Sequence, residues 1–185
     1  VEAYTLIGQG QMLCGEHTAA DIIIESALKI ADKHRLSFQE KTLRVYVAVL
    51  HQFKGELDIA KELLLKELDG ANHQFLPTIY NNLGIISGEK KDYKDSLSWF
   101  TKAREMREKE GRMDYAAGLM TNQSEMLLHQ GQIQEARELL FEALDIMESP
   151  QYENSLGKMF VFRDLGNIHF SEGETQEAID NYRLA

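Results

Sequence analysis

The chain has 185 residues and a formal net charge of −10, with 30 acidic against 20 basic residues. This balance argues against binding to nucleic acid, whose phosphates attract basic patches, and against an anionic membrane surface. No run of about 20 apolar residues is present, so no membrane insertion is predicted. The single cysteine, Cys14, excludes a disulfide framework and fits a reducing, cytoplasmic location.

The predicted elements are helices that follow one another in pairs. Apolar residues recur at helical spacing along the chain, and no alternation typical of strands competes with them. In chain order the pattern predicts helices over residues 2–14, 18–34, 38–54, 57–70, 78–88, 92–110, 113–130, 133–148, 153–172 and 175–185. The sequence therefore predicts an all-α fold of about ten antiparallel helices.

The third helix pair shows how two such helices close on each other. Tyr80 and Gly84 lie on one face of its first helix, and Ser96, Phe100 and Ala103 lie at i, i+4 and i+7 on its second. Glycine inside a helix costs about 1 kcal/mol against alanine, so it usually has a packing reason. We expect a small residue on one helix to face a bulky residue on the other.

The same arrangement recurs five times when Tyr80 is counted as the fourth residue of its repeat. The eighth position is small in every repeat: Gly8, Ala48, Gly84, Ser124 and Gly166. The twentieth position is also small: Ala20, Ala60, Ser96, Ala136 and Ala178. The twenty-fourth is bulky: Ile24, Leu64, Phe100, Leu140 and Tyr182. A turn glycine, able to adopt a left-handed conformation, occupies the fifteenth position in four repeats, and Lys91 replaces it in the third.

This pattern resembles the tetratricopeptide repeat, and the resemblance covers essentially the whole chain. The repeat spacing runs from 36 residues, between Arg44 and Tyr80, to 42, between Met120 and Phe162. Such lengths resemble the extended repeats of kinesin light chains, spindle-orientation adaptors and bacterial peptide-pheromone receptors. The resemblance implies a right-handed α-solenoid of five repeats in a single domain, 1–185. Their approximate ranges are 1–36, 37–75, 76–112, 113–152 and 153–185.

Two repeats depart from the family pattern. The second has Arg44, Val47 and Glu67 where the family usually has an aromatic residue, leucine and alanine, and the fourth has Gln123 in place of leucine. These residues predict looser packing at those positions, without a change of fold.

The ends of the chain lack the polar caps that terminal repeats normally need. The chain starts at Val1 without methionine and stops at Ala185, within a predicted helix. We therefore expect a fragment of a longer protein, or a chain whose ends are disordered. A homodimer through the uncapped ends is one further expectation, since exposed apolar helix faces favour association.

The resemblance also implies a concave groove lined by the first helix of each repeat. Carried over position by position, the predicted peptide-binding groove contains Asn81, Asn82, Ile85, Thr121, Asn122, Glu125, His129, Arg163 and Asn167. An asparagine amide both donates and accepts hydrogen bonds, so it can bind a peptide backbone whatever its side chains. Arg163 is expected to take a carboxylate. The lysine set with which chaperone-binding members clamp a C-terminal carboxylate is absent.

No catalytic or metal-binding constellation is visible in the sequence. None of the six histidines has a histidine partner at i+3 or i+4 on a helix, as a helical metal pair requires. Gly8-Gln-Gly10 lacks the further residues of a phosphate loop. We therefore predict no catalytic residue, no metal, no cofactor and no enzymatic activity.

Three functions compete. The first is a protein–protein interaction module that binds a peptide or partner segment in its groove. The second is a sensory or regulatory segment of a larger bacterial signalling or transcription-regulating protein. The third is an enzyme-like role similar to the response-regulator phosphatases, which carry the same extended repeats behind an N-terminal helical bundle that is not visible here.

Overall fold

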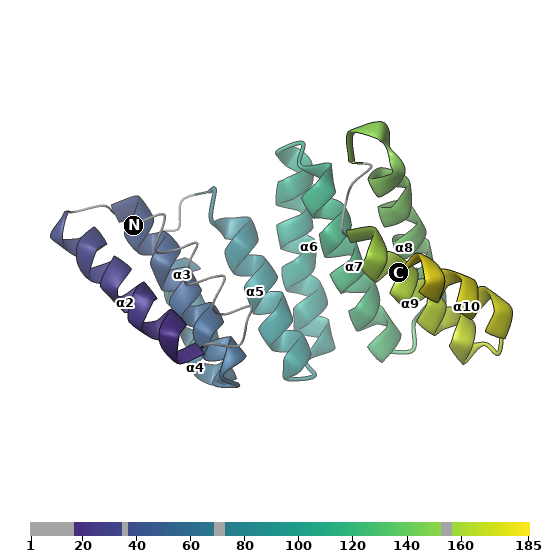
Figure 1. The fold of residues 1–185 in the computed structure, drawn as a ribbon, viewed down its shortest axis with the longest axis horizontal. Helices are drawn as coiled ribbons and strands as arrows, with labels where there is room; N and C mark the ends of the chain where they lie inside the picture. The colour runs from purple at the N-terminus through teal and green to yellow at the C-terminus, as the bar shows by residue number, and fades with distance from the viewer. Residues whose placement is uncertain (1–16, 35–36, 69–72, 153–156) are drawn as a thin grey trace. The chain divides into compact units, whose positions relative to one another are not determined.

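The computed structural model describes residues 17–34, 37–68, 73–152 and 157–185. These residues form nine α-helices and one short 3-10 helix, with no strand among them, so the all-α prediction is confirmed (Figure 1). The α-helices are α2 His17–Lys33, α3 Ser37–Phe53, α4 Leu57–Leu68, α5 Leu76–Glu89, α6 Tyr93–Lys109, α7 Met113–His129, α8 Ile133–Glu148, α9 Gly157–Ser171 and α10 Thr175–Leu184.

The described helices lie close to the predicted ranges. The predicted helix over 2–14 lies outside the described residues. Between α8 and α9, Pro150–Tyr152 forms the 3-10 helix, and the described part of α9 begins at Gly157. Among the described residues, no helix combines the length and the apolar character needed to cross a membrane.

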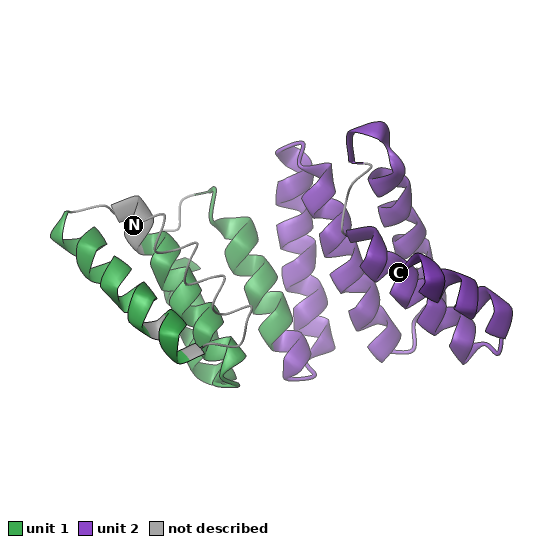
Figure 2. Ribbon diagram, viewed as in Figure 1, with its two compact units in different colours: residues 1–86 green, residues 87–185 purple. Residues whose placement is uncertain are grey.

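The chain divides into two compact units (Figure 2). Unit 1 comprises residues 1–86 and contains α2, α3, α4 and most of α5, whereas unit 2 comprises residues 87–185 and contains α6 to α10. That residues 1–185 act as a single solenoid domain stays a prediction.

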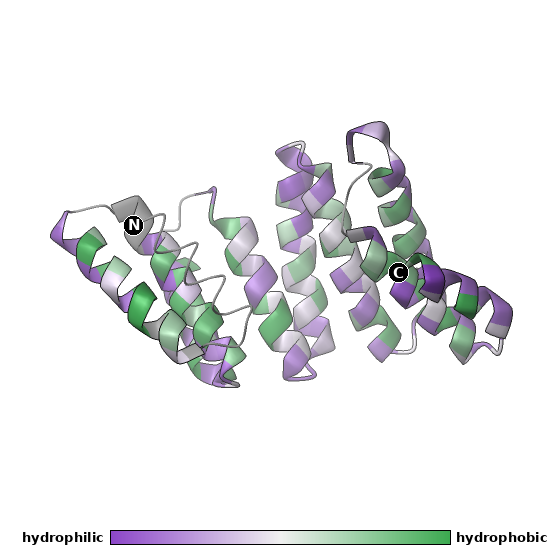
Figure 3. Cartoon of the chain, in the orientation of Figure 1, coloured by the Kyte–Doolittle hydropathy of each residue, from purple (hydrophilic) through white to green (hydrophobic). Residues whose placement is uncertain are grey.

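Each unit has its own apolar core, and hydrophobic and hydrophilic residues are interspersed along its helices (Figure 3). In unit 1, α2 packs against α3 through Ala20, Ile24, Ala27, Ala31, Leu43 and Leu50. In unit 2 the core joins α7, α8 and α9 through Ala117, Met120, Leu140, Ala143, Met147, Val161, Leu165 and Ile168. Burial of these faces is the main favourable term that holds the helix pairs together.

The small and large positions of the repeat interlock as the sequence predicts. All five residues at the twentieth position are at most 1% exposed: Ala20, Ala60, Ser96, Ala136 and Ala178. A Cβ atom added to Gly166 on α9 would lie 2.6 Å from the ring of Tyr182 on α10. Since real Cβ contacts are longer than this, only glycine lets α9 and α10 approach so closely.

The turns within the repeats share one backbone geometry. Gly55, Gly131 and Gly173 have φ angles of 76°, 75° and 81°, and Lys91 adopts the same left-handed conformation with a φ of 62°. In the turn of Lys91, its amide donates to the carbonyl of Gly88, and the next amide, of Asp92, donates to Ser87, both at 2.8 Å. This pair of bonds is a Schellman motif, which satisfies the last carbonyls of a helix.

The residues that depart from the family pattern find partners within their own units. Arg44 on α3 forms an ion pair with Glu67 on α4, 3.3 Å between Nη1 and Oε1. Gln123 on α7 is 6% exposed, and its Nε2 donates to Oγ1 of Thr101 on α6 at 2.8 Å. Arg44 and Glu67 are therefore paired with each other, whereas Gln123 is only partly satisfied, because its buried Oε1 has no hydrogen-bond partner among the described residues.

Candidate functional site

A pocket of about 200 Å³ opens between α7 and α9 in unit 2. It is lined by Gly118, Thr121, Asn122 and Glu125 of α7 and by Gly157, Phe160 and Arg163 of α9. The α7 residues are spaced at i, i+3, i+4 and i+7, which places them on one helical face. Away from the pocket, Ala117 and Met120 of α7 belong to the core shared with α8 and α9. Core packing thus fixes the wall of the pocket.

The α7 wall combines open space with polar groups. A Cβ atom added to Gly118 would meet nothing within 4 Å, so the missing side chain leaves room in the pocket. Thr121 is 6% exposed, and its hydroxyl donates to the carbonyl of Ala117 at 3.2 Å, which holds the side chain in place. Asn122 is half-buried beside it and contributes an amide. The exposed Glu125 adds a carboxylate.

The α9 wall presents a guanidinium that is already engaged. Nε of Arg163 donates to Oδ1 of Asp164 at 2.7 Å, and the Asp164 side chain is only 3% exposed. The hydrogen bond to Asp164 and the negative charges of Asp164 and Glu125 outweigh partial burial and raise the pKa of Arg163. The guanidinium carbon also lies 5.3 Å from the ring centroid of Phe160, within cation–π range. Arg163 is therefore a fixed, fully charged group.

Four of the nine predicted groove residues meet in this pocket: Thr121, Asn122, Glu125 and Arg163. Two others in unit 2 make different contacts. His129 is exposed and stacks on Tyr93 of α6, with ring centroids 4.8 Å apart and planes 7° from parallel. Asn167 accepts a hydrogen bond from the Tyr182 hydroxyl at 2.9 Å.

The remaining three predicted residues lie on α5 in unit 1. Asn81 and Ile85 are half-buried. Asn82 is 9% exposed, and its Nδ2 donates to the carbonyl of Thr78, one turn earlier, at 2.8 Å. Part of the Asn82 amide therefore serves its own helix, as asparagine side chains often do. That these three residues contact a ligand stays a prediction.

Sequence reasoning missed three residues of the pocket: Gly118, Gly157 and Phe160. Gly118 and Phe160 occupy the second position of the fourth and fifth repeats, which in the tetratricopeptide pattern faces the groove. That position could have identified both of them. Gly157 precedes the first position of its repeat, and the pattern contains no signal for it.

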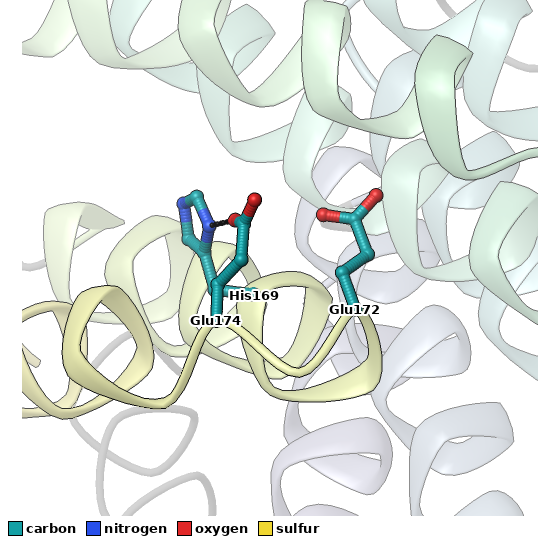
Figure 4. A group of neighbouring side chains, drawn as sticks. All are labelled: His169, Glu172 and Glu174. Carbon is teal, nitrogen blue, oxygen red and sulfur yellow. Dashed lines mark hydrogen bonds and ion pairs between the residues drawn. The ribbon is translucent and has the colours of Figure 1, made fainter.

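One group of residues has the composition of a metal site. The ligand atoms of His169, Glu172 and Glu174 lie within 4.8 Å of one another at the turn between α9 and α10 (Figure 4). The group contains one histidine and two glutamates, so it does not fit the pattern of two histidines one helical turn apart.

The contacts of this group favour a structural role. Nδ1 of His169 lies 2.6 Å from Oε2 of Glu174, and Glu172 forms an ion pair with Arg137 of α8. The equivalent pair in the second repeat, His51 and Glu56, makes the same contact across the same turn. A histidine–glutamate pair that recurs at one position of the repeat is explained by the closing of the turn.

Comparison with known proteins gives the same family as the sequence pattern. Family models described as tetratricopeptide repeat match residues 78–110 and 115–185. No curated protein matches the chain in sequence.

Several solved structures have a similar fold. BtubC (BKLC) from P. vanneervenii superposes with a TM-score of 0.78 at 19% identity, over 97% of this chain and 76% of that one. A putative kinesin light chain with TPR-like repeats from Podosopora anserina gives 0.73 at 15%, over 98% and 91%. The STAND protein PH0952 from Pyrococcus horikoshii, which has a tetratricopeptide repeat sensor, gives 0.80 at 15%, over 97% and 28%. At these identities the likeness shows the fold alone.

Proposed function

Because the chain belongs to the tetratricopeptide repeat family, we propose that it binds a peptide segment of a partner protein in the groove between α7 and α9. Repeats of this family generally act as non-catalytic interaction scaffolds, which supports a binding role over an enzymatic one. A single cysteine, which cannot form a disulfide within the chain, supports a cytoplasmic location.

The observation that carries the proposal is the meeting of predicted groove residues from two repeats in one pocket. Thr121, Asn122 and Glu125 come from the fourth repeat, and Arg163 comes from the fifth. Their helices are held by a shared core, so the polar groups are positioned before a ligand arrives. A site that is already formed loses less entropy on binding.

The size of the pocket favours a peptide anchor over a small molecule. Its volume of about 200 Å³ is below the range of about 300–1,000 Å³ that is usual for small-molecule sites. It suits one side chain of a peptide whose backbone runs along the groove. The Asn122 amide is of the type that binds peptide groups of any sequence.

Selection from a phage-displayed library of random peptides tests this proposal. Gly118→Leu fills the pocket from a helical position where an added Cβ meets nothing within 4 Å. Replacing glycine inside a helix also raises helix propensity, so the variant is expected to fold. We expect peptides selected on the unchanged protein to lose at least about tenfold in affinity for Gly118→Leu, a loss of about 1.4 kcal/mol.

Gln134→Leu is the matched control, because it adds a leucine at an exposed position of α8 outside the pocket lining. It should bind the selected peptides as the unchanged protein does. Peptides that bind all three proteins equally would refute the groove as the site.

A second candidate is a sensory segment of a larger signalling protein. The structural likeness to the STAND protein PH0952, which has a tetratricopeptide repeat sensor, supports it at the level of fold. If the gene encodes an adjoining output domain, a peptide selected as above should change the activity of that domain. Output that does not respond to a bound peptide would leave the interaction module as the better description.

A further inference from the structure

The charges around the pocket do not balance. Glu125 and Arg163 are the charged residues among its lining. The Arg163 charge is already matched by Asp164, whose carboxylate is 2.7 Å away. Glu125 forms no ion pair with any residue that the structure describes, although it lies near enough to influence the guanidinium. Among the described residues that line the pocket or lie directly behind it, the two carboxylates of Glu125 and Asp164 exceed the one guanidinium of Arg163 by one negative charge.

A second acceptor lies behind Arg163. Asp164 is 2% exposed, and its Oδ2 has no hydrogen-bond partner among the described residues. The negative charge of this buried carboxylate is therefore offset by Arg163 alone among the described residues. The local field favours a ligand group that carries a positive charge.

We propose that this pocket takes the lysine or arginine side chain of a basic peptide segment in the partner protein. This inference rests on the proposed function and names the chemistry of the peptide. Glu125 would pair with the cationic head at the mouth of the pocket. The chain as a whole, with a net charge of −10, would attract the same kind of segment over longer distances.

The shape of the pocket fits the apolar stem of such a side chain as well as its head. Gly118 leaves the α7 wall open, and Phe160, which is 45% exposed, provides an aromatic surface on the α9 side. Lysine and arginine pack their methylene groups on apolar surfaces while the charged end stays near polar groups.

The inference reverses the sequence-based expectation that Arg163 takes a carboxylate from the ligand. An acidic ligand group would have to compete with Asp164 for the guanidinium and would be repelled by Glu125. Asp164 follows Arg163 directly in the sequence, but the burial of its carboxylate against the guanidinium is visible only in the fold.

The test compares the residues enriched among library peptides after selection on four proteins: the unchanged chain, Gly118→Leu, Glu125→Lys and Glu142→Lys. Glu142 is exposed on α8 and outside the pocket lining, so its substitution makes the same change in net charge elsewhere. We expect lysine or arginine to be enriched at one fixed position on the unchanged chain and on Glu142→Lys. The enrichment should vanish on Gly118→Leu and change to aspartate or glutamate on Glu125→Lys.

Affinity measurements on a selected peptide complete the test. Replacing its lysine or arginine by norleucine should raise the Kd for the unchanged chain at least about tenfold, and should have little effect on binding to Glu125→Lys. Pocket-dependent peptides with neutral or acidic residues at that position would overturn this inference and leave the proposed function standing. A library that yields no pocket-dependent peptide would overturn both. Equal losses with Glu125→Lys and Glu142→Lys would show a general effect of charge and would also overturn the inference.

Discussion

Two glycines in unit 2 occupy the first helices of successive repeats and have opposite surroundings. Gly166 on α9 faces α10, and a Cβ there would lie 2.6 Å from the Tyr182 ring. Gly118 on α7 faces the pocket, and a Cβ there would meet nothing within 4 Å. Both residues carry the same penalty for glycine inside a helix.

The difference separates two uses of one residue. At Gly166 the absent side chain allows two helices to pack, so the glycine serves the fold. At Gly118 the absent side chain leaves a hollow on a face that needs none for packing. Glycine at position 118 lowers the stability of α7 without any gain in packing. What the glycine provides instead is the open space of the pocket.

Gly166→Ala should give the largest change in stability. The methyl group would push the Tyr182 ring aside and strain its hydrogen bond to Asn167. We expect a loss of about 1–2 kcal/mol, since overpacking costs more than the helix propensity gained. Urea unfolding measures this loss. In a Tyr182→Ala background the same substitution should become stabilising, and a loss of equal size in both backgrounds would show that the ring is not the cause.

Gly118→Ala should have the opposite sign. With no neighbour to clash, the substitution gains helix propensity and should stabilise unit 2 by about 0.5–1 kcal/mol. For a chain of this length the gain corresponds to a rise in Tm of about 2–4 °C per kcal/mol. Thermal unfolding followed by circular dichroism measures it. A fall in Tm would contradict the description of Gly118 as a residue free of packing contacts.

Lys91→Gly extends the comparison to a position where glycine is missing. Lys91 holds a φ of 62°, the left-handed conformation that three of the equivalent residues reach as glycine. A left-handed conformation costs an L-residue about 1–2 kcal/mol, and part of the relief is offset by the greater freedom of glycine in the unfolded chain. We expect a net gain of about 0.5 kcal/mol in the free energy of unfolding. The equivalent change Lys90→Gly, one residue earlier at the helix end, should not stabilise the protein.

The sequence predicted the fold in detail because the repeat constrains each position several times over. The buried small residues at the twentieth position, from Ala20 to Ala178, and the contact between Gly166 and Tyr182 follow from one pattern read five times. The paired departures were not foreseen. The pairing of Arg44 with Glu67, and of Gln123 with Thr101, joins neighbouring helices. The spacing of these residues in the sequence does not indicate that their side chains meet.

The candidate site was predicted only in part. Its shape depends on side-chain contacts and on the open volume between α7 and α9, which a repeat pattern does not specify. Thr121, Asn122, Glu125 and Arg163 were placed by their repeat positions. His129 and Asn167 occupy groove positions too, but a ring stack with Tyr93 and a hydrogen bond from Tyr182 engage them. The pairing of Arg163 with Asp164 sets the charge of the pocket, and a repeat pattern does not specify it.

The most direct test of the pocket as a binding site is the ratio of Kd values for one library-selected peptide, measured on Gly118→Leu and on Gly118→Ala. Both substitutions add helix propensity at the same residue, and they differ mainly in how much of the pocket they fill. We expect both proteins to be at least as stable as the unchanged chain, and the leucine variant to bind the peptide at least about tenfold more weakly than the alanine variant. Equal affinity of the two variants for that peptide would contradict this expectation.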